Sequence, residues 1–175
     1  MKVRVKMVRK ILGIFISFAI AGLMQSSAFA LDLRWQSNPI LVCLPPNPNS
    51  ELMKQAFREW QKVTKEKVTF NFLTANSCPD AKITISYAPN KVKSRTSYSY
   101  SGKYFKKAHI EMGLLTKEGN PAPKDVLLLL MEHEIGHAIG ITGHTNTPNS
   151  VMQPTVKSGY TITNDSIKEV YRLYK

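Results

Sequence analysis

The residues that most constrain the fold of this chain lie between positions 133 and 144, in the sequence His-Glu-Ile-Gly-His-Ala-Ile-Gly-Ile-Thr-Gly-His. They follow the apolar run Leu127–Met131, which predicts a buried helix over residues 124–138. Residues four apart lie on one face of a helix, about one turn apart, so His133 and His137 can both reach a single zinc ion. Burying polar side chains on a helix costs free energy unless they have a binding partner. We therefore expect these histidines to bind a metal ion.

A third ligand is expected from the residues that follow the helix. Gly140 comes three residues after His137, where a residue in the left-handed conformation can end the helix and reverse the chain. That reversal would bring His144 back to the metal. Three protein ligands leave the fourth position of a catalytic zinc ion open for water, and Glu134 is then placed to accept a proton from the metal-activated water. The pattern predicts one catalytic zinc ion.

The first 30 residues have the features of a secretory signal peptide. Residues 1–10 carry five bases and no acid, an apolar run of 14 residues follows over Ile11–Met24, and Ala28–Ala30 has the small-residue pattern of a cleavage site. Because about 20 apolar residues are needed to span a bilayer, we expect cleavage after Ala30 rather than a retained anchor. Losing five bases and no acid lowers the formal net charge from +12 to +7 and leaves residues 31–175 as one domain. We expect the protein to be secreted or periplasmic.

Export also affects the interpretation of the two cysteines, Cys43 and Cys78. Two cysteines exclude a disulfide-dense small protein and a zinc module with four cysteine ligands. In an oxidising compartment a pair of cysteines tends to form a disulfide. Both residues fall near the carboxyl ends of predicted neighbouring strands, so we expect a disulfide bond between them rather than two free thiols.

The remaining pattern predicts a single α+β unit without repeats or linkers. An apolar run, a helical pattern and two alternating segments predict parallel strands joined by a helix, over residues 38–44, 50–64, 67–73 and 82–88. Residues 89–107 interrupt the pattern, with a turn expected at Gly102. A further strand over 109–115, the helix over 124–138 and a last helix from about residue 163 complete the unit.

The extended histidine motif resembles the zinc-binding motif of the metzincin metalloproteases, HExxHxxGxxH, and especially that of their matrixin branch. In this chain the third histidine comes one residue later, after Thr142 and Gly143. Ser150–Pro154 resembles the Met-turn of these enzymes, with Met152 eight residues past His144. Segments 56–70 and 165–174 are similar to the first helix with its following strand, and to the final helix, so the resemblance covers roughly residues 35–175.

The resemblance implies a metzincin-like catalytic domain with a mixed sheet of about five strands, three helices and a Met-turn. It implies a zinc endopeptidase in which His133, His137 and His144 bind zinc and Glu134 acts as the general base. Leu129 and Leu130 correspond to residues that line the specificity pocket, although a role in the core is an equal alternative.

One further position and one segment depart from the family pattern. Val156 stands where matrixins have a tyrosine after the Met-turn, and Tyr160 is the candidate substitute. Residues 89–107 lack the loop that binds structural zinc and calcium in animal matrixins, so we expect no second zinc, while calcium stays undecided. We expect a monomer that acts on protein or peptide substrates and has no stable membrane anchor after cleavage.

Two alternatives remain open from the sequence. One is a gluzincin-type peptidase, with Glu169 of the last helix as the third ligand. The other is an exported, non-catalytic binding module or effector with a structural zinc, which would use the basic span 81–110. That span has seven bases and no acid, interleaved with aromatic residues. Export argues against nucleic acid as its partner, and a basic rim for acidic substrates or a solvated hairpin fits better.

Overall fold

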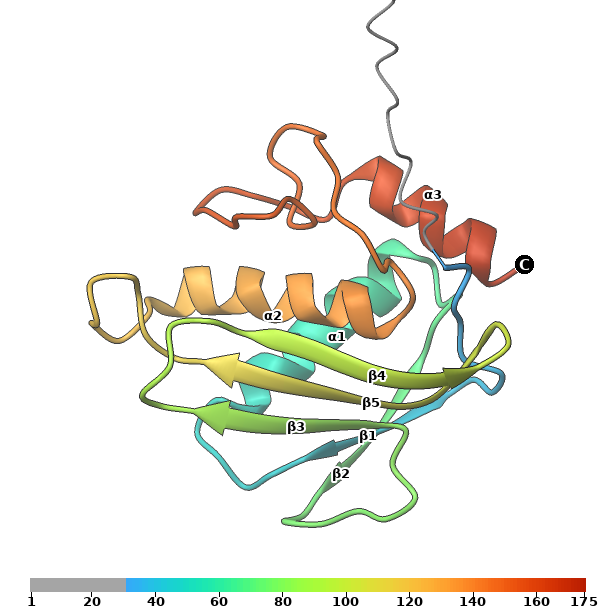
Figure 1. Ribbon diagram of the computed structural model, residues 1–175, viewed down its shortest axis with the longest axis horizontal. Helices are drawn as coiled ribbons and strands as arrows, with labels where there is room; N and C mark the ends of the chain where they lie inside the picture. Colours follow the sequence, from blue (N-terminus) through green and yellow to red (C-terminus); the bar gives the residue numbers. More distant parts are fainter. Residues whose placement is uncertain (1–30) are drawn as a thin grey trace, which may run out of the picture.

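The computed structural model describes residues 31–175, and the expected signal peptide lies outside the described residues. Within residues 31–175, no helix is long and apolar enough to cross a membrane. Five strands and three helices form the fold (Figure 1). In chain order they are β1 (Ile40–Leu44), α1 (Ser50–Val63), β2 (Phe70–Thr74), β3 (Ile83–Ala88), β4 (Arg95–Ser101), β5 (Tyr104–Gly113), α2 (Lys124–Ala138) and α3 (Asn164–Leu173).

The strands form one mixed sheet in the order β2-β1-β3-β5-β4. Strand β1 pairs in parallel with β2 and β3, β3 pairs in parallel with β5, and β4 is the antiparallel edge strand. The α+β class, the mixed five-stranded sheet and the three helices predicted from the sequence are confirmed. The parallel pairing of β1 and β2 around α1 also agrees with the expected strand–helix–strand unit.

The polar segment that interrupted the sequence pattern is a β-hairpin. Its turn contains Gly102, which has a positive φ of 56°. Strand β5 starts at Tyr104, five residues before the strand expected at residue 109. The pairing register shifts between Ser99 and Tyr100, and Phe105 and Ala108 are both buried although they are three residues apart. A bulge breaks strict alternation, which explains why the sequence pattern did not reveal the start of the strand.

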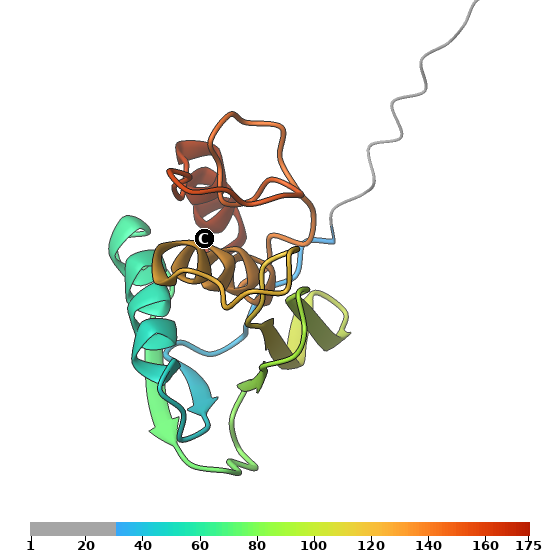
Figure 2. The ribbon, with the colours of Figure 1, turned by 90° about the vertical axis from the view of Figure 1, so that its left-hand side faces the viewer.

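Helices α1 and α2 cover one face of the sheet, and α2 lies between that face and the loops that lead to α3 (Figure 2). Two buried tryptophans fix the backbone of α2. Trp60 of α1 donates its indole N–H to the carbonyl of Glu132 at 2.8 Å, and Trp35 donates to the carbonyl of Ala138 at 2.9 Å. A buried indole N–H needs an acceptor. The two bonds therefore hold α2 in place in the core at Glu132 and at Ala138.

A close contact joins α2 to the Met-turn, Ser150–Pro154. Met152 is 1% exposed, and a Cβ atom placed on Gly136 would lie 2.3 Å from its Sδ atom. Only glycine therefore fits at position 136 without displacing Met152. Met152 therefore packs against α2 at Gly136, which lies between His133 and His137 in the sequence.

Cys43 and Cys78 form the disulfide bond expected from the sequence, with a Cα–Cα distance of 5.8 Å. The bridge joins β1 to the segment between β2 and β3 and spans 35 positions of sequence.

The disulfide gives a prediction for stability. Replacing both cysteines by alanine should lower the free energy of unfolding by about 3–4 kcal/mol. The bridge restricts the unfolded chain by closing a loop of this length, and without it the unfolded chain regains that conformational entropy. Urea unfolding of the oxidised protein, the reduced protein and the double variant would measure it. A reduced protein and a double variant that both unfold at the wild-type urea concentration would show that the bridge contributes nothing.

Candidate metal centre

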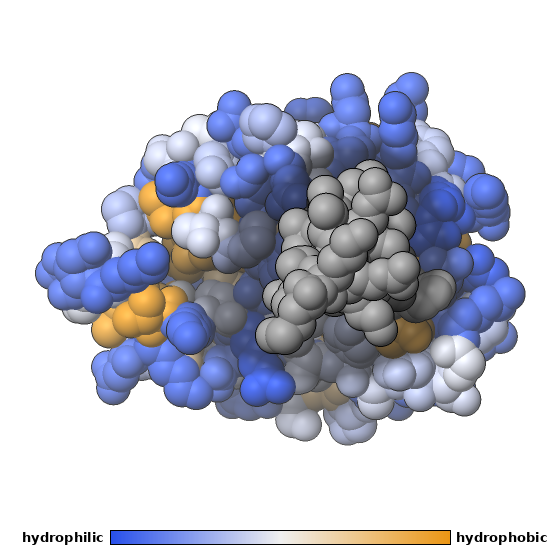
Figure 3. All heavy atoms as spheres, turned by 45° about the horizontal axis from the view of Figure 1, so that its top comes forward, coloured by the Kyte–Doolittle hydropathy of each residue, from blue (hydrophilic) through white to orange (hydrophobic). Residues whose placement is uncertain are grey.

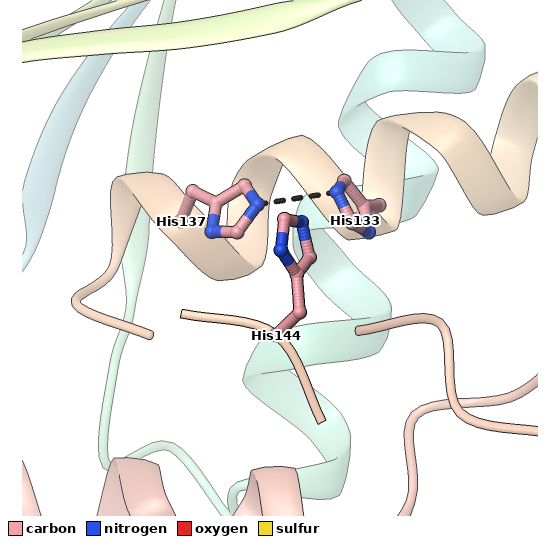
Figure 4. Close-up of side chains that lie close together, drawn as sticks. All are labelled: His133, His137 and His144. Atoms are coloured by element: carbon pink, nitrogen blue, oxygen red, sulfur yellow. Dashed lines mark hydrogen bonds between the residues drawn. The ribbon is translucent and has the colours of Figure 1, made fainter. Parts of the chain in front are cut away.

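The helix that carries the first two histidines ends where the sequence predicts. Gly140 has a φ of 116°, and its N–H donates to the carbonyl of His137 at 3.2 Å. A Cβ atom at this position would also lie 2.2 Å from the carbonyl oxygen of Leu33. Glycine is therefore required both by the left-handed turn and by the close approach of the N-terminal segment. After this turn the chain reverses and His144 returns toward α2 (Figure 4).

The three imidazole rings face one another. One ring nitrogen from each of His133, His137 and His144 lies within 4.8 Å of the others, and no other group of three such side chains was found in residues 31–175. The Nε2 atoms of His133 and His137 are 3.1 Å apart. Nitrogen ligands at 2.0–2.1 Å in a tetrahedral zinc site lie roughly 3.3 Å apart. The spacing of the first two rings fits a shared ion.

Backbone carbonyls orient these two rings. Nδ1 of His133 lies 2.6 Å from the carbonyl oxygen of Val151, and Nδ1 of His137 lies 2.6 Å from that of Ile141. A carbonyl only accepts, so each Nδ1 carries the proton and, in the neutral ring, each Nε2 presents a lone pair. Two lone pairs at this separation repel unless a cation lies between them. The donor set therefore fits a metal ion.

Burial keeps the rings neutral. It lowers the pKa of His133, and burial together with the nearby His133 lowers the pKa of His137 to about 4. Metal ions bind only the unprotonated imidazole. These two ligands therefore need not lose a proton to bind an ion at neutral pH.

The loop that carries His144 is fixed to the start of α3. The hydroxyls of Thr145 and Thr147 each lie 2.9 Å from Oδ2 of Asp165, and the N–H of Thr145 donates to the carbonyl of Met152. The additional residue of the motif is accommodated where space is free, since a Cβ atom on Gly143 would have no neighbour within 4 Å. The longer loop thus still returns His144 to the other histidines.

Glu134 lies beside the cluster and is 5% exposed. Its Oε2 atom is 2.6 Å from the hydroxyl of Thr96 on the edge strand β4. Burial raises the pKa of Glu134 above its usual range, and the hydrogen bonds with Thr96 oppose that rise. The sequence pattern does not distinguish Thr96, because alternation along β4 indicates only that this residue faces inward.

A cavity of about 790 Å³ opens beside the histidines and Glu134. Its walls come from the segment before β4 and from β4 itself, from the loop after β5, from α2 and from the segment after the Met-turn. Leu130 and Val156 line it. Leu129 and Tyr160, the other residues considered for a substrate pocket, are partly buried against the hydrophobic core and are not among the lining residues.

Glu169, the alternative third ligand, lines a small pocket together with His144, but its carboxylate is bound by Arg172. Its carboxylate accepts two hydrogen bonds from Arg172, one turn further along α3, at 2.7 and 2.6 Å. It is absent from the candidate metal ligands found in residues 31–175. The geometry favours His144.

Comparison with known proteins agrees with the motif. A sequence model of the family described as Matrixin matches residues 31–175. A search of curated proteins found no match.

The competing third ligands give a direct prediction. His144→Ala should weaken zinc binding by at least about 100-fold, because a ligand is lost, whereas Glu169→Gln should bind zinc as the wild type does. Competition with a fluorescent zinc chelator would measure both affinities, and elemental analysis would give the stoichiometry. If Glu169→Gln lost zinc and His144→Ala kept it, the assignment of the third ligand would be wrong.

Proposed function

The chain belongs to the matrixin family of zinc metalloproteases, and on that premise we propose that it is a zinc-dependent endopeptidase that hydrolyses peptide bonds in proteins. The observation that carries this proposal is the cluster of three imidazole nitrogens next to a buried carboxylate, at the wall of an open cavity. A purely structural zinc site is closed by protein ligands on all sides. Here the described residues supply three nitrogens, and the cavity reaches all three histidines and Glu134.

In this proposal His133, His137 and His144 hold one zinc ion. Zinc bound there would supply a Lewis acid that polarises a scissile carbonyl and lowers the pKa of a water molecule towards ~7. The carbonyl hydrogen bonds of Val151 and Ile141 support this role, because they hold two of the rings with Nε2 pointing inward.

Glu134 is the proposed general base. It takes a proton from the attacking water and passes it to the nitrogen of the leaving amine, so the peptide bond breaks while the carboxylate is restored. Its burial favours this exchange, because a raised pKa brings a carboxylate closer to the pKa of the groups with which it trades protons. Thr96 supports the role by holding one carboxylate oxygen in place.

The sheet edge offers a way to hold the substrate. Strand β4 is one of the two edge strands, and its first residues, Arg95 and Thr96, line the cavity. An extended peptide can pair with an exposed edge through main-chain hydrogen bonds. We propose that the substrate runs along β4 and places one side chain in the cavity next to Leu130.

We propose further that residues 1–30 are a cleaved signal peptide and that residues 31–175 are the mature enzyme. The disulfide between Cys43 and Cys78 supports an extracytoplasmic location, because such bonds persist in oxidising compartments. The protein would then act in the periplasm or the surrounding medium.

The role of Glu134 is testable. Glu134→Gln should bind zinc normally but lose a factor of about 10²–10⁴ in kcat, because the amide cannot accept the proton. Turnover of casein and of a quenched fluorescent peptide library, with and without a zinc chelator, would measure it. Glu118→Gln, an exposed carboxylate on the same cavity, is the matched control and should remain active. Wild-type protein that unfolds on zinc removal yet cleaves nothing would instead support the non-catalytic binding module.

The contact with Thr96 gives a second test. Thr96→Val keeps the size of the side chain but removes the hydroxyl, so we expect kcat to fall about tenfold with little change in KM, as for loss of one hydrogen bond to a charged group. Thr96→Ser should restore kcat. If the serine variant were as slow as the valine variant, the effect would come from packing rather than from the hydrogen bond.

A further inference from the structure

The cavity beside the metal centre is surrounded by positive charge. Four exposed cations contribute to its walls, and we call them the rim cations: Lys93, Arg95, Lys117 and Lys157. They come from three separate segments, which precede or begin β4, follow β5 and follow the Met-turn. Two of the rim cations, Lys93 and Arg95, belong to the basic span 81–110 of the sequence, and the other two lie outside it.

Within residues 31–175 the rim cations have no ion-pair partner, since none of the salt bridges there includes them. Glu111 stands opposite Arg95 in the β4–β5 register, but its carboxylate is bound by Lys91 at 2.8 Å. The acidic side chains that line the cavity are Glu118, which is exposed, and Glu134, which Thr96 holds beside the histidines. The cations therefore outnumber the available carboxylates at the entrance.

Part of the cavity wall is apolar. Valine, leucine, alanine and proline side chains make up much of its wall, from Val92, Leu115, Ala122, Val126, Leu130, Pro154 and Val156. Figure 3 shows patches of hydrophobic residues bordered by hydrophilic ones on the face that it presents. A ligand that matches both the apolar wall and the rim cations has an apolar side chain with negative charges close to it.

We propose that the cavity selects acidic peptides, in which aspartate or glutamate residues flank a large apolar residue next to the scissile bond. This inference rests on the proposed function and adds the class of substrate to it. The apolar residue enters the cavity beside Leu130, and its acidic neighbours along β4 meet the rim cations. A cleft with one sign of charge concentrates the field between its low-dielectric walls, which favours acidic ligands over neutral ones.

A peptide fits these observations better than an anionic polymer of the cell envelope. Such a polymer would satisfy the cations but would leave the apolar wall exposed to water. The cavity also reaches Glu134 and the histidines, where the proposed hydrolysis needs a peptide bond.

The test uses three peptides that share one apolar residue at the cleavage site and differ only in their flanking residues. One carries Glu, one carries Gln of nearly the same size, and one carries Lys. We expect kcat/KM for the Glu peptide to exceed that for the Gln peptide about tenfold, with the Lys peptide lowest, since each exposed ion pair contributes up to about fivefold. The preference should shrink as salt rises from 50 to 500 mM, because salt screens exposed charges.

Substitutions of the rim cations test whether these residues cause the preference for the Glu peptide. Lys117→Gln combined with Lys157→Gln should lower the ratio of kcat/KM between the Glu and Gln peptides severalfold, because two of the four rim cations are lost. Lys103→Gln combined with Lys106→Gln is the matched control. It removes the same charge from exposed lysines that do not line the cavity, and it should keep the preference.

Binding separates this inference from the proposed function. Coumarin-labelled Glu and Gln peptides are titrated against the zinc-loaded Glu134→Gln variant, so that affinity is measured without turnover. Tighter binding of the Glu peptide to this variant would support the acidic preference even if the wild-type protein cleaved no peptide. The absence of cleavage by the wild type would then count against the endopeptidase. Equal binding and equal cleavage of both peptides would overturn the acidic preference alone. Polyphosphate that competes as strongly as the Glu peptide would also overturn it, in favour of a general polyanion surface.

Discussion

The structure depends on one unfavourable arrangement, which is the placement of ionisable side chains on a helix buried in the core. Helix α2 is covered by the sheet, by α1 and by the Met-turn, yet it carries His133, Glu134 and His137. Such groups are tolerated inside a protein when each polar atom has a partner. The carbonyls of Val151 and Ile141 and the hydroxyl of Thr96 supply these partners. The elements around α2 are thus arranged as much by its polar atoms as by its apolar ones.

Much of this arrangement could be predicted from the sequence, because it rests on local patterns. The bounds of α2, residues 124–138, follow from an apolar run, a preceding proline and a glycine beyond its end. The reversal at Gly140 follows from the conformational freedom of glycine. The disulfide followed from the topology of parallel strands, whose carboxyl ends lie at one edge of the sheet.

What the sequence did not reveal depends on contacts between distant segments. The bulge in the β4–β5 hairpin hid five residues of β5, because it puts Phe105 and Ala108 on the same side. The contact of Thr96 with Glu134 joins residues 38 positions apart, and no local pattern distinguishes Thr96 from any other inward-facing threonine. The rim cations are a similar case, since two of the four lie outside the basic span visible in the sequence.

The three histidines also differ in how firmly they are held. His133 and His137 lie on α2, and each ring is tied to a backbone carbonyl. His144 is exposed, stands on a loop, and its ring has no hydrogen bond to another part of residues 31–175. Release of a bound ion should therefore begin at His144, with the other two rings still in place. The lifetime of the ion in the protein would then be set by the opening rate of a single loop, anchored through Asp165, rather than by unfolding of the helix.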